Sequence, residues 1–184
     1  MSKILFLDIE TTGFSRDWNE VLEVGAILWN DNTKKDIDAF HEYIKPLAGL
    51  PAKITELTGI TREKVANCRN ERLVLMDFAE WIAISKPDII VGHNCKAFDL
   101  GFLAKRCEKF GINWDISNIQ IIDTLTLAKQ MNKNGEIKTE NNKQTTLAAY
   151  FNINYEAHSA IEDVKALIKI YNKMLDIQNN DVGF

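Results

Sequence analysis

The sequence predicts an α/β fold in which helices cover a mixed β-sheet. Strand patterns dominate the N-terminal part, helix and strand patterns alternate after it, and 46% of the 184 residues are hydrophobic. A chain of this length and apolar content can form one core, and a second independent core is not expected. We therefore expect a single domain over residues 1–176, followed by a short C-terminal tail at 177–184.

Three strands are expected first along the chain. Residues 3–9 form an apolar run, and residues 20–29 form a second one. Residues 36–45 begin with alternating polar and apolar side chains and end at the breaker Pro46. Apolar runs and period-two alternation bounded by breakers are typical of strands. The chain therefore begins with three strands.

From Pro51 onward the apolar spacing becomes helical. Pro51 and Gly59 are residue types typical of a helix start and a helix end, and a second short helix is expected at 61–67. The segment 71–85 keeps a helical apolar period over about four turns. We expect its buried stripe to consist of Leu73, Met76, Phe78, Ala79 and Ile82.

The second half of the chain alternates short strands with helices. Strands are expected at 88–93 and 119–123, and a helix at 97–110 ends before Gly111. Further helices are expected at 124–131, 145–151 and 159–175, with a polar stretch at 132–143. Strands first and alternation later predict a mixed sheet with helices packed over it.

Composition restricts the compartment and the partners. The three cysteines, Cys68, Cys95 and Cys107, have no metal-ligand spacing and suit a reducing cytoplasm. No apolar run reaches the roughly 18 residues that a membrane span needs, so we expect no membrane partner. The net charge of −4 argues against a general nucleic-acid binder. Divalent cations held by carboxylates would make the local potential positive, so that an acidic protein could still bind a polyanion such as a nucleic acid.

Asp8 and Glu10 are the first candidate functional residues. They stand two positions apart at the end of the first expected strand, so both side chains point to the same face. A solvated strand end is the ordinary explanation of such a pair. Two like charges beside an apolar strand are costly unless they share a cation. We expect both to bind metal.

Asp99 and Asp163 are expected to be inward-facing acids on helices. Asp99 shares its helix face with Phe102 and Leu103, although an N-cap role is the alternative for it. Asp163 continues an apolar stripe toward Leu167. Glu162, in contrast, faces Lys165 and Lys169 as ordinary surface pairing. Asp163, not Glu162, is therefore the expected site residue.

His158 completes the constellation. It stands just ahead of the last helix, where a loop can place its imidazole beside the acids. Four carboxylates and one histidine without cysteine ligands favour Mg²⁺ or Mn²⁺ over zinc. Two such ions about 3.5–4 Å apart clamp an in-line attack on phosphorus. We expect His158 to take the proton from the attacking water as general base, and Asp8 to bridge both ions.

Three segments resemble a known family. "FLDIETTG", "HNCKAFDLGFL" and "HSAIED" are similar, in order and spacing, to the motifs of the DEDD 3′-to-5′ exonucleases in their histidine-containing, DnaQ-like branch, which includes proofreading exonucleases of bacterial DNA polymerase III. The resemblance extends over roughly residues 3–175. It implies a ribonuclease H-like fold with a five-stranded mixed sheet, two Mg²⁺ or Mn²⁺ ions, and release of mononucleotides from a 3′ end.

The resemblance also implies roles for single residues. Asp8, Glu10, Asp99 and Asp163 would hold the metals, with His158 as general base. The backbone at Thr11 and Thr12 would meet the terminal nucleotide, Leu50 would wedge against the last bases, and Asn94 and Phe98 would line the site. For Leu50 and Phe98, ordinary core packing is the alternative.

The expected partner is the 3′ end of single-stranded DNA. An exoribonuclease that trims RNA is the alternative within the class, and a catalytically silent nucleic-acid-binding module is the alternative outside it. A metal-stabilised structural domain is not favoured, because a core of this size needs no ions to fold. No long C-terminal extension of the kind by which proofreading subunits reach a polymerase is expected, so a stable polymerase partner is possible but not supported. The sequence is silent on oligomeric state. Trp18 is the candidate for base stacking, and Lys133, Lys138 and Lys143 for backbone contacts.

Overall fold

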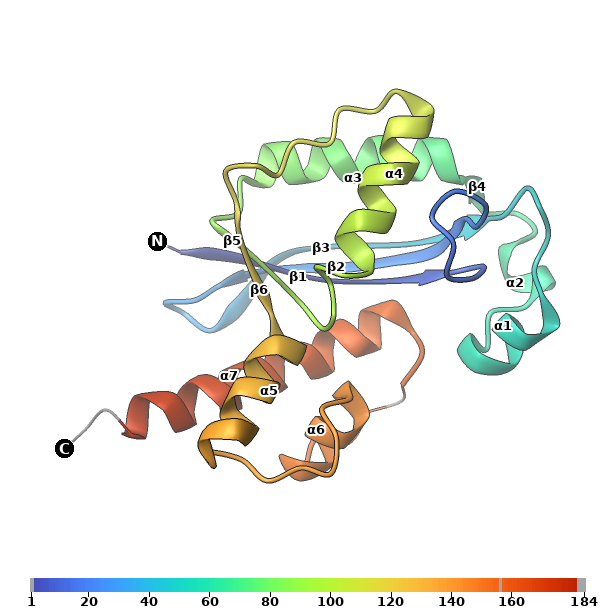
Figure 1. Cartoon of the computed structure of the whole chain (residues 1–184). Coiled ribbons are helices and arrows are strands. Elements are labelled where there is room, and N and C mark those ends of the chain that lie inside the picture. Colours follow the sequence, from blue (N-terminus) through green and yellow to red (C-terminus); the bar gives the residue numbers. More distant parts are fainter. Residues whose placement is uncertain (1, 156, 182–184) are drawn as a thin grey trace.

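The computed structural model describes residues 2–155 and 157–181, and within them one mixed sheet forms the centre of the molecule (Figure 1). Its strand order is β4-β3-β2-β1-β5-β6. The strands are β1 (Lys3–Thr11), β2 (Val21–Asn30), β3 (Lys35–Lys45), β4 (Arg69–Asn70), β5 (Ile89–Gly92) and β6 (Gln120–Asp123).

The pairing explains the strand patterns of the sequence. β1, β2 and β3 pair antiparallel, whereas β5 runs parallel to β1 and β6 runs parallel to β5. The predicted mixed α/β sheet is confirmed. A sixth strand, the two-residue β4, was not expected, because so short a segment beside a helix start has no strand period to detect.

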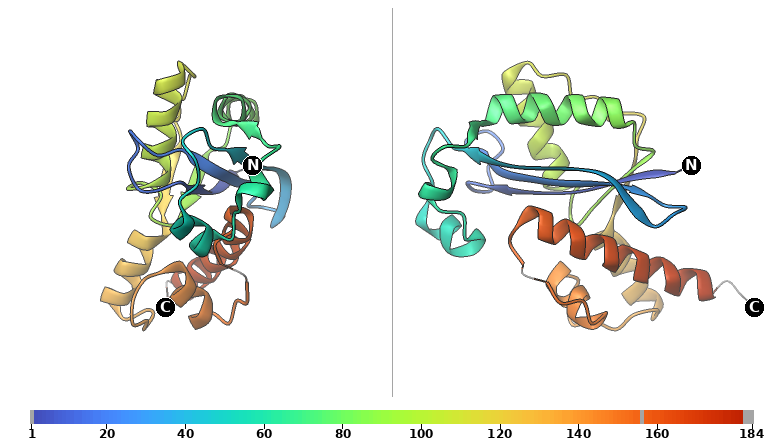
Figure 2. Two further views of the ribbon diagram at one scale, coloured as in Figure 1. Left: turned by 90° about the vertical axis from the view of Figure 1, so that its right-hand side faces the viewer. Right: turned by 180° about the vertical axis from the view of Figure 1, so that it is seen from behind.

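Helices lie on both faces of this sheet. They are α1 (Ala52–Thr58), α2 (Arg62–Val65), α3 (Glu71–Ser85), α4 (Asp99–Phe110), α5 (Thr124–Asn134), α6 (Gln144–Tyr150) and α7 (Ala160–Asp181). α3 and α4 cover one face, and α5, α6 and α7 lie on the other (Figures 1 and 2).

Strand β1 divides the core between these two layers. Leu5, Leu7 and Ile9 are buried in the cluster that includes residues of α3 and α4. Ile4 and Phe6 are buried in the cluster that includes residues of α7. Because side chains alternate along a strand, Asp8 and Glu10 continue the row of Ile4 and Phe6 and emerge on the α7 side.

The expected buried stripe of α3 is partly wrong. Leu73 and Met76 are 42% and 41% exposed, whereas Val74 and Leu75 are fully buried. The buried residues of α3 are Glu71, Val74, Leu75, Phe78 and Ile82. These buried residues lie on one face of the helix. The expected set combined residues from two faces, because apolar residues occur nearly all around this segment.

The C-terminal helix is longer than expected. α7 continues to Asp181, so residues 177–181 of the expected tail are helical, and residues 182–184 lie outside the described part of the chain. Within the described residues no helix is both long enough and apolar enough to cross a membrane. Cys95 and Cys107 are buried and Cys68 is half-buried, all as free thiols.

Candidate active site

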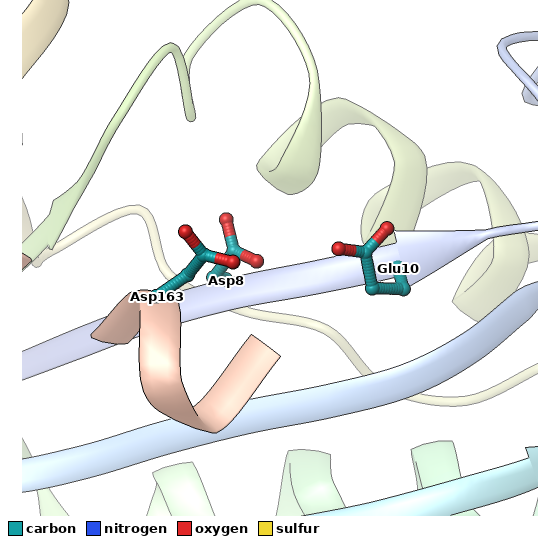
Figure 3. Close-up of side chains that lie close together, drawn as sticks. All are labelled: Asp8, Glu10 and Asp163. Carbon is teal, nitrogen blue, oxygen red and sulfur yellow. The ribbon is translucent and has the colours of Figure 1, made fainter. Parts of the chain in front are cut away.

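Three of the expected acids meet where β1 passes the start of α7. Asp8 and Glu10 project from β1, and Asp163 meets them from the first turn of α7 (Figure 3). One carboxylate oxygen from each residue lies within 4.8 Å of the other two. The two-residue spacing on a strand and the helical position together bring the three side chains to one point.

Asp99 lines the same pocket from the opposite layer. It is the first residue of α4, is 3% exposed, and accepts a hydrogen bond from the Ile9 N–H through Oδ1 at 3.2 Å. The N-cap of α4 is Phe98, so the capping alternative for Asp99 is wrong. Asp99 faces inward as expected, but it lies outside the group of three. Its role as a metal ligand stays a prediction.

Asp163 is held by hydrogen bonds to both of its oxygens. The His158 N–H donates to Oδ2 at 2.8 Å, and the Gln144 side-chain amide donates to Oδ1 at 2.9 Å and to the Asp163 carbonyl at 3.0 Å. Gln144 begins α6 and lines the pocket. Sequence reasoning did not select Gln144, because a polar residue at a helix start is usually solvated.

His158 lies at the edge of the pocket, with an exposed side chain. Its φ is +73°, a left-handed conformation that costs free energy for a residue with a Cβ. The hydrogen bond from its backbone N–H to Asp163 offsets part of that cost. The imidazole is therefore next to the acids without being packed among them, as a proton acceptor for a bound water requires.

The acids of the pocket resist ionisation. Burial, followed by the charges of Asp99, Asp163, Glu10 and Glu23, raises the pKa of Asp8 well above its usual value. Burial and the same kind of repulsion raise the pKa of Glu10 to about 8. Burial raises the pKa of Asp99 to about 7 and also raises the pKa of Asp163. Among the described residues, no lysine or arginine forms an ion pair with these four carboxylates.

The donor set fits Mg²⁺ or Mn²⁺. Carboxylate oxygens are the ligands that these ions prefer, and a dication would supply the positive charge that the raised pKa values call for. The nearest thiol is a poor ligand, because burial raises the pKa of Cys95 to about 12 and keeps it protonated. Asp8, Glu10 and Asp163 are the residues that would hold an ion, with Asp99 beside them.

The pocket has a volume of about 220 Å³. Its lining consists of Asp8, Ile9, Glu10, His93, Asn94, Phe98, Asp99, Gln144, His158 and Asp163. Asn94 and Phe98 are thus at the site, as expected. His93, which was not expected, is half-buried, and its Nδ1 lies 2.9 Å from Thr124 Oγ1.

Thr11 and Thr12 lie next to the site, with their side chains turned inward. They are 7% and 5% exposed, and their hydroxyls bond to the Gly13 carbonyl and the Glu20 N–H. Leu50 is not brought to the acids. It is 4% exposed, packs with Leu22, Ile60 and Val65, and borders a different depression. Core packing, its alternative, is what this structure shows.

Asp123 organises the loop that carries Asn94. Its carboxylate accepts the backbone N–H groups of Asn94 at 3.0 Å and Lys96 at 3.1 Å, and it caps α5 through the Leu125 N–H at 3.0 Å. Asn94 has a left-handed φ of +63°. Sequence reasoning missed Asp123 because an acid before a helix looks like an ordinary N-cap.

Comparison with known proteins decides the family. Residues 5–171 match the exonuclease family RNase_T. The chain belongs to this exonuclease family. The prediction that the chain is a DnaQ-like 3′-to-5′ exonuclease is confirmed as a family assignment.

Two curated relatives of this exonuclease domain are DNA polymerases. This chain is 33% identical over 175 residues to the PolC-type DNA polymerase III of Caldanaerobacter subterraneus subsp. tengcongensis. The alignment covers 95% of this chain and 12% of the polymerase. The chain is 33% identical over 169 residues to the PolC-type DNA polymerase III of Bacillus subtilis, which covers 91% of this chain and 11% of that protein. The chain thus spans about an eighth of the length of these relatives.

Solved structures confirm the fold of the exonuclease domain. Exonuclease I of E. coli in complex with a dT13 oligonucleotide superposes with a TM-score of 0.85, at 20% identity, over 98% of this chain and 42% of that one. Cell-death related nuclease 4 gives a TM-score of 0.78 at 18% identity, over 96% of this chain and 64% of that one. The mixed sheet with helices on both faces is therefore the ribonuclease H-like fold that was expected.

Proposed function

We propose that this exonuclease domain removes nucleoside 5′-monophosphates from the 3′ end of single-stranded DNA. The observation that carries the proposal is the meeting of Asp8, Glu10 and Asp163 in one pocket with Asp99 and His158. A binding module has no use for converging carboxylates, which repel a phosphate backbone unless cations intervene. The PolC-type relatives and the exonuclease I complex with DNA support DNA as the substrate.

Two Mg²⁺ or Mn²⁺ ions are proposed at Asp8, Glu10, Asp163 and Asp99. When bound, such ions polarise the phosphoryl group and lower the pKa of a coordinated water. The side chains of the protein then orient the attacking water and accept its proton. His158 Nδ1 or Nε2 accepts the proton of the attacking water, and the Asp163 hydrogen bond to its backbone holds it at the pocket edge.

The loop after β1 carries two exposed aromatic rings, and one of them contacts a residue that lines the pocket. Phe14 and Trp18, in the loop after β1, are each 83% exposed. Phe14 packs edge to face against Phe98, with 6.2 Å between ring centroids, so one aromatic surface leads into the pocket. Stacking on such rings is tolerant of sequence and needs unpaired bases.

The backbone path beyond the pocket is proposed to follow the lysines of residues 132–143. Lys133, Lys138 and Lys143 are all exposed. The loop itself is anchored, because Ile137 is 1% exposed and Asn132 bonds to Thr139 and Asn142. Leu50 keeps no part in this proposal, since its side chain is packed elsewhere.

The test is a cleavage time course. Single-stranded DNA and RNA of the same sequence, labelled at the 5′ end, are incubated with Mg²⁺, with Mn²⁺ or with EDTA. We expect a ladder that shortens from the 3′ end only with metal, and faster on DNA. Asp163→Ala should abolish it, whereas Glu162→Ala, whose side chain pairs with Lys165 at the surface of the same helix, should not. A faster RNA ladder would move the substrate to RNA, and binding without cleavage by the wild type would favour the silent module.

A further inference from the structure

Glu23 is a buried carboxylate behind the proposed active site that the mechanism does not use. It lies on β2 directly opposite Glu10 on β1, and its side chain is 0% exposed. Its Oε1 lies 2.7 Å from His41 Nε2 and accepts a hydrogen bond from Ser159 Oγ at 3.2 Å. Its Oε2 has no hydrogen-bond partner among the described residues. A buried acid that is only half satisfied weakens a fold, so its position calls for another explanation.

The partners of Glu23 connect two distant parts of the chain. His41 is on β3, the next strand of the sheet, and is half-buried. Ser159 directly precedes α7 and follows His158. Burial raises the pKa of Glu23, but the hydrogen bond from His41 and the backbone amide of Ala160 outweigh it, so that the pKa is lowered. The Glu23 carboxylate therefore faces the start of α7, where Ser159 donates a hydrogen bond to it.

Gly25 brings α7 close to the same strand. It lies opposite Asp8 on β1, and a Cβ built on it would come within 2.5 Å of the Ala160 carbonyl carbon and 2.6 Å of the Ile161 nitrogen. The first turn of α7 thus rests directly on the β2 backbone. Residues 23 and 25 share one face of β2, and they are the neighbours of Glu10 and Asp8.

We propose that Glu23, supported by His41, is a positioning residue that fixes the first turn of α7 on the sheet. Through Ser159 it sets the place of His158 and Asp163 relative to Asp8 and Glu10. This inference rests on the proposed function, because it assigns Glu23 to the geometry of that same metal site. Partners of metal ligands act this way in other proteins, and losing one lowers metal affinity or activity by about 10–100-fold.

The decisive comparison is Glu23→Ala against Glu23→Gln. Alanine removes the acceptor for Ser159, whereas glutamine keeps an oxygen at that place and can still bond to His41. We expect Glu23→Ala to bind Mn²⁺ about 10–100-fold more weakly and to lower kcat, with KM nearly unchanged. Glu23→Gln should restore both within about fivefold, the value of one modest hydrogen bond.

Two controls separate positioning from general stability. Glu42→Ala removes a carboxylate next to His41 on the same strand, where it pairs with Arg69 at the surface, and should leave Mn²⁺ affinity and kcat unchanged. Thermal unfolding of each variant identifies a temperature at which all are folded, and Mn²⁺ titration by calorimetry is done at that temperature. Glu23→Ala with wild-type Mn²⁺ affinity and kcat would overturn the proposal.

Two further variants test the same proposal if Glu23→Ala does not fold. His41→Ala and Ser159→Ala each remove one contact to Glu23, and each should weaken Mn²⁺ binding by about threefold to tenfold. No change in either would overturn the positioning role. Calorimetry needs no turnover, so it decides this point even if the wild type cleaves no 3′ end, an outcome that would overturn the proposed function instead.

Discussion

A buried acid on one side of the sheet and a group of three half-buried acids on the other side have opposite electrostatic surroundings. Glu71, at the start of α3, is 2% exposed and forms a two-pronged pair with Arg106 of α4, with contacts of 2.8 and 2.5 Å. The Val21 N–H also donates to it at 2.9 Å. Among the described residues, no arginine or lysine pairs with Asp8, Glu10 or Asp163, and the pKa values of these three acids are raised. The acid paired with an arginine stabilises the fold, whereas the group of acids without such a partner is where we propose that a cation binds.

The largest effect is expected from removing one of the three pocket acids. Asp163→Ala and Asp8→Ala should lower kcat by at least about 10³-fold, because a lost metal ligand removes several kcal/mol of transition-state stabilisation. Metal-free stability should stay the same or rise as repulsion is relieved. Cleavage assays and urea unfolding measure the two quantities. Activity above a few per cent of wild type would contradict the assignment of either residue.

His158→Ala tests the residue at the edge of the acid group. Loss of a general base should lower kcat by about 10²–10⁴-fold with little change in KM. Steady-state kinetics with a short single-stranded substrate provide the measurement. If KM rose while kcat held, His158 would bind substrate and not accept a proton.

The pair of Glu71 and Arg106 should respond in the opposite sense. Arg106→Met leaves Glu71 buried without its cation, which should cost about 3–5 kcal/mol of unfolding free energy. Urea unfolding measures the loss, and the Mn²⁺ affinity of the folded variant should match that of the wild type. If Arg106→Met folded but no longer bound metal, the claim that Glu71 has a structural role separate from the three pocket acids would be wrong.

The pH dependence of stability should separate the two groups further. Carboxyls with raised folded-state pKa values stabilise the protein only while protonated, so this contribution is present at low pH and is lost as pH rises through about 7 for Asp99 and about 8 for Glu10. Metal-free protein should therefore lose stability as pH rises from about 4, the ordinary pKa of a carboxyl group, to about 8, by about 1.4 kcal/mol for each pKa unit involved. Thermal unfolding with EDTA and with saturating Mg²⁺ tests this, since Mg²⁺ should remove the loss. A metal-free stability that did not fall would contradict the raised pKa values.

Gln144 should give the smallest effect. Gln144→Leu removes the amide that bonds to Asp163 Oδ1, so the carboxylate gains freedom, and kcat should fall by about threefold to tenfold. Gln144→Glu is a sharper variant, because it adds a further carboxylate beside Asp163 and should lower the metal concentration needed for half-maximal rate. Kinetics at several Mg²⁺ concentrations measure both.

The sequence predicted the parts of this molecule that depend on short periods. Alternation along one strand placed Asp8 and Glu10 together, and the helical stripe around Asp163 selected it over Glu162. Contacts between distant segments were not predictable. Nothing near Glu23 in the sequence indicates Ser159, and Leu50 beside a proline gave no sign of its packing against Ile60. The phase of α3 failed for a related reason, because an all-round apolar helix is oriented by its neighbours and not by its own pattern.

The separation of Asp8 and Asp163 along the chain has a consequence for biosynthesis. Two of the three acids that meet in the pocket come from β1, and the third comes from α7, which packs across β1 and β2. Contacts of such long sequence separation form late in folding, after their loops have closed. The acid group is therefore incomplete until α7 has been made and has docked on β1 and β2. A product that ends before α7 carries Asp8 and Glu10 without Asp163.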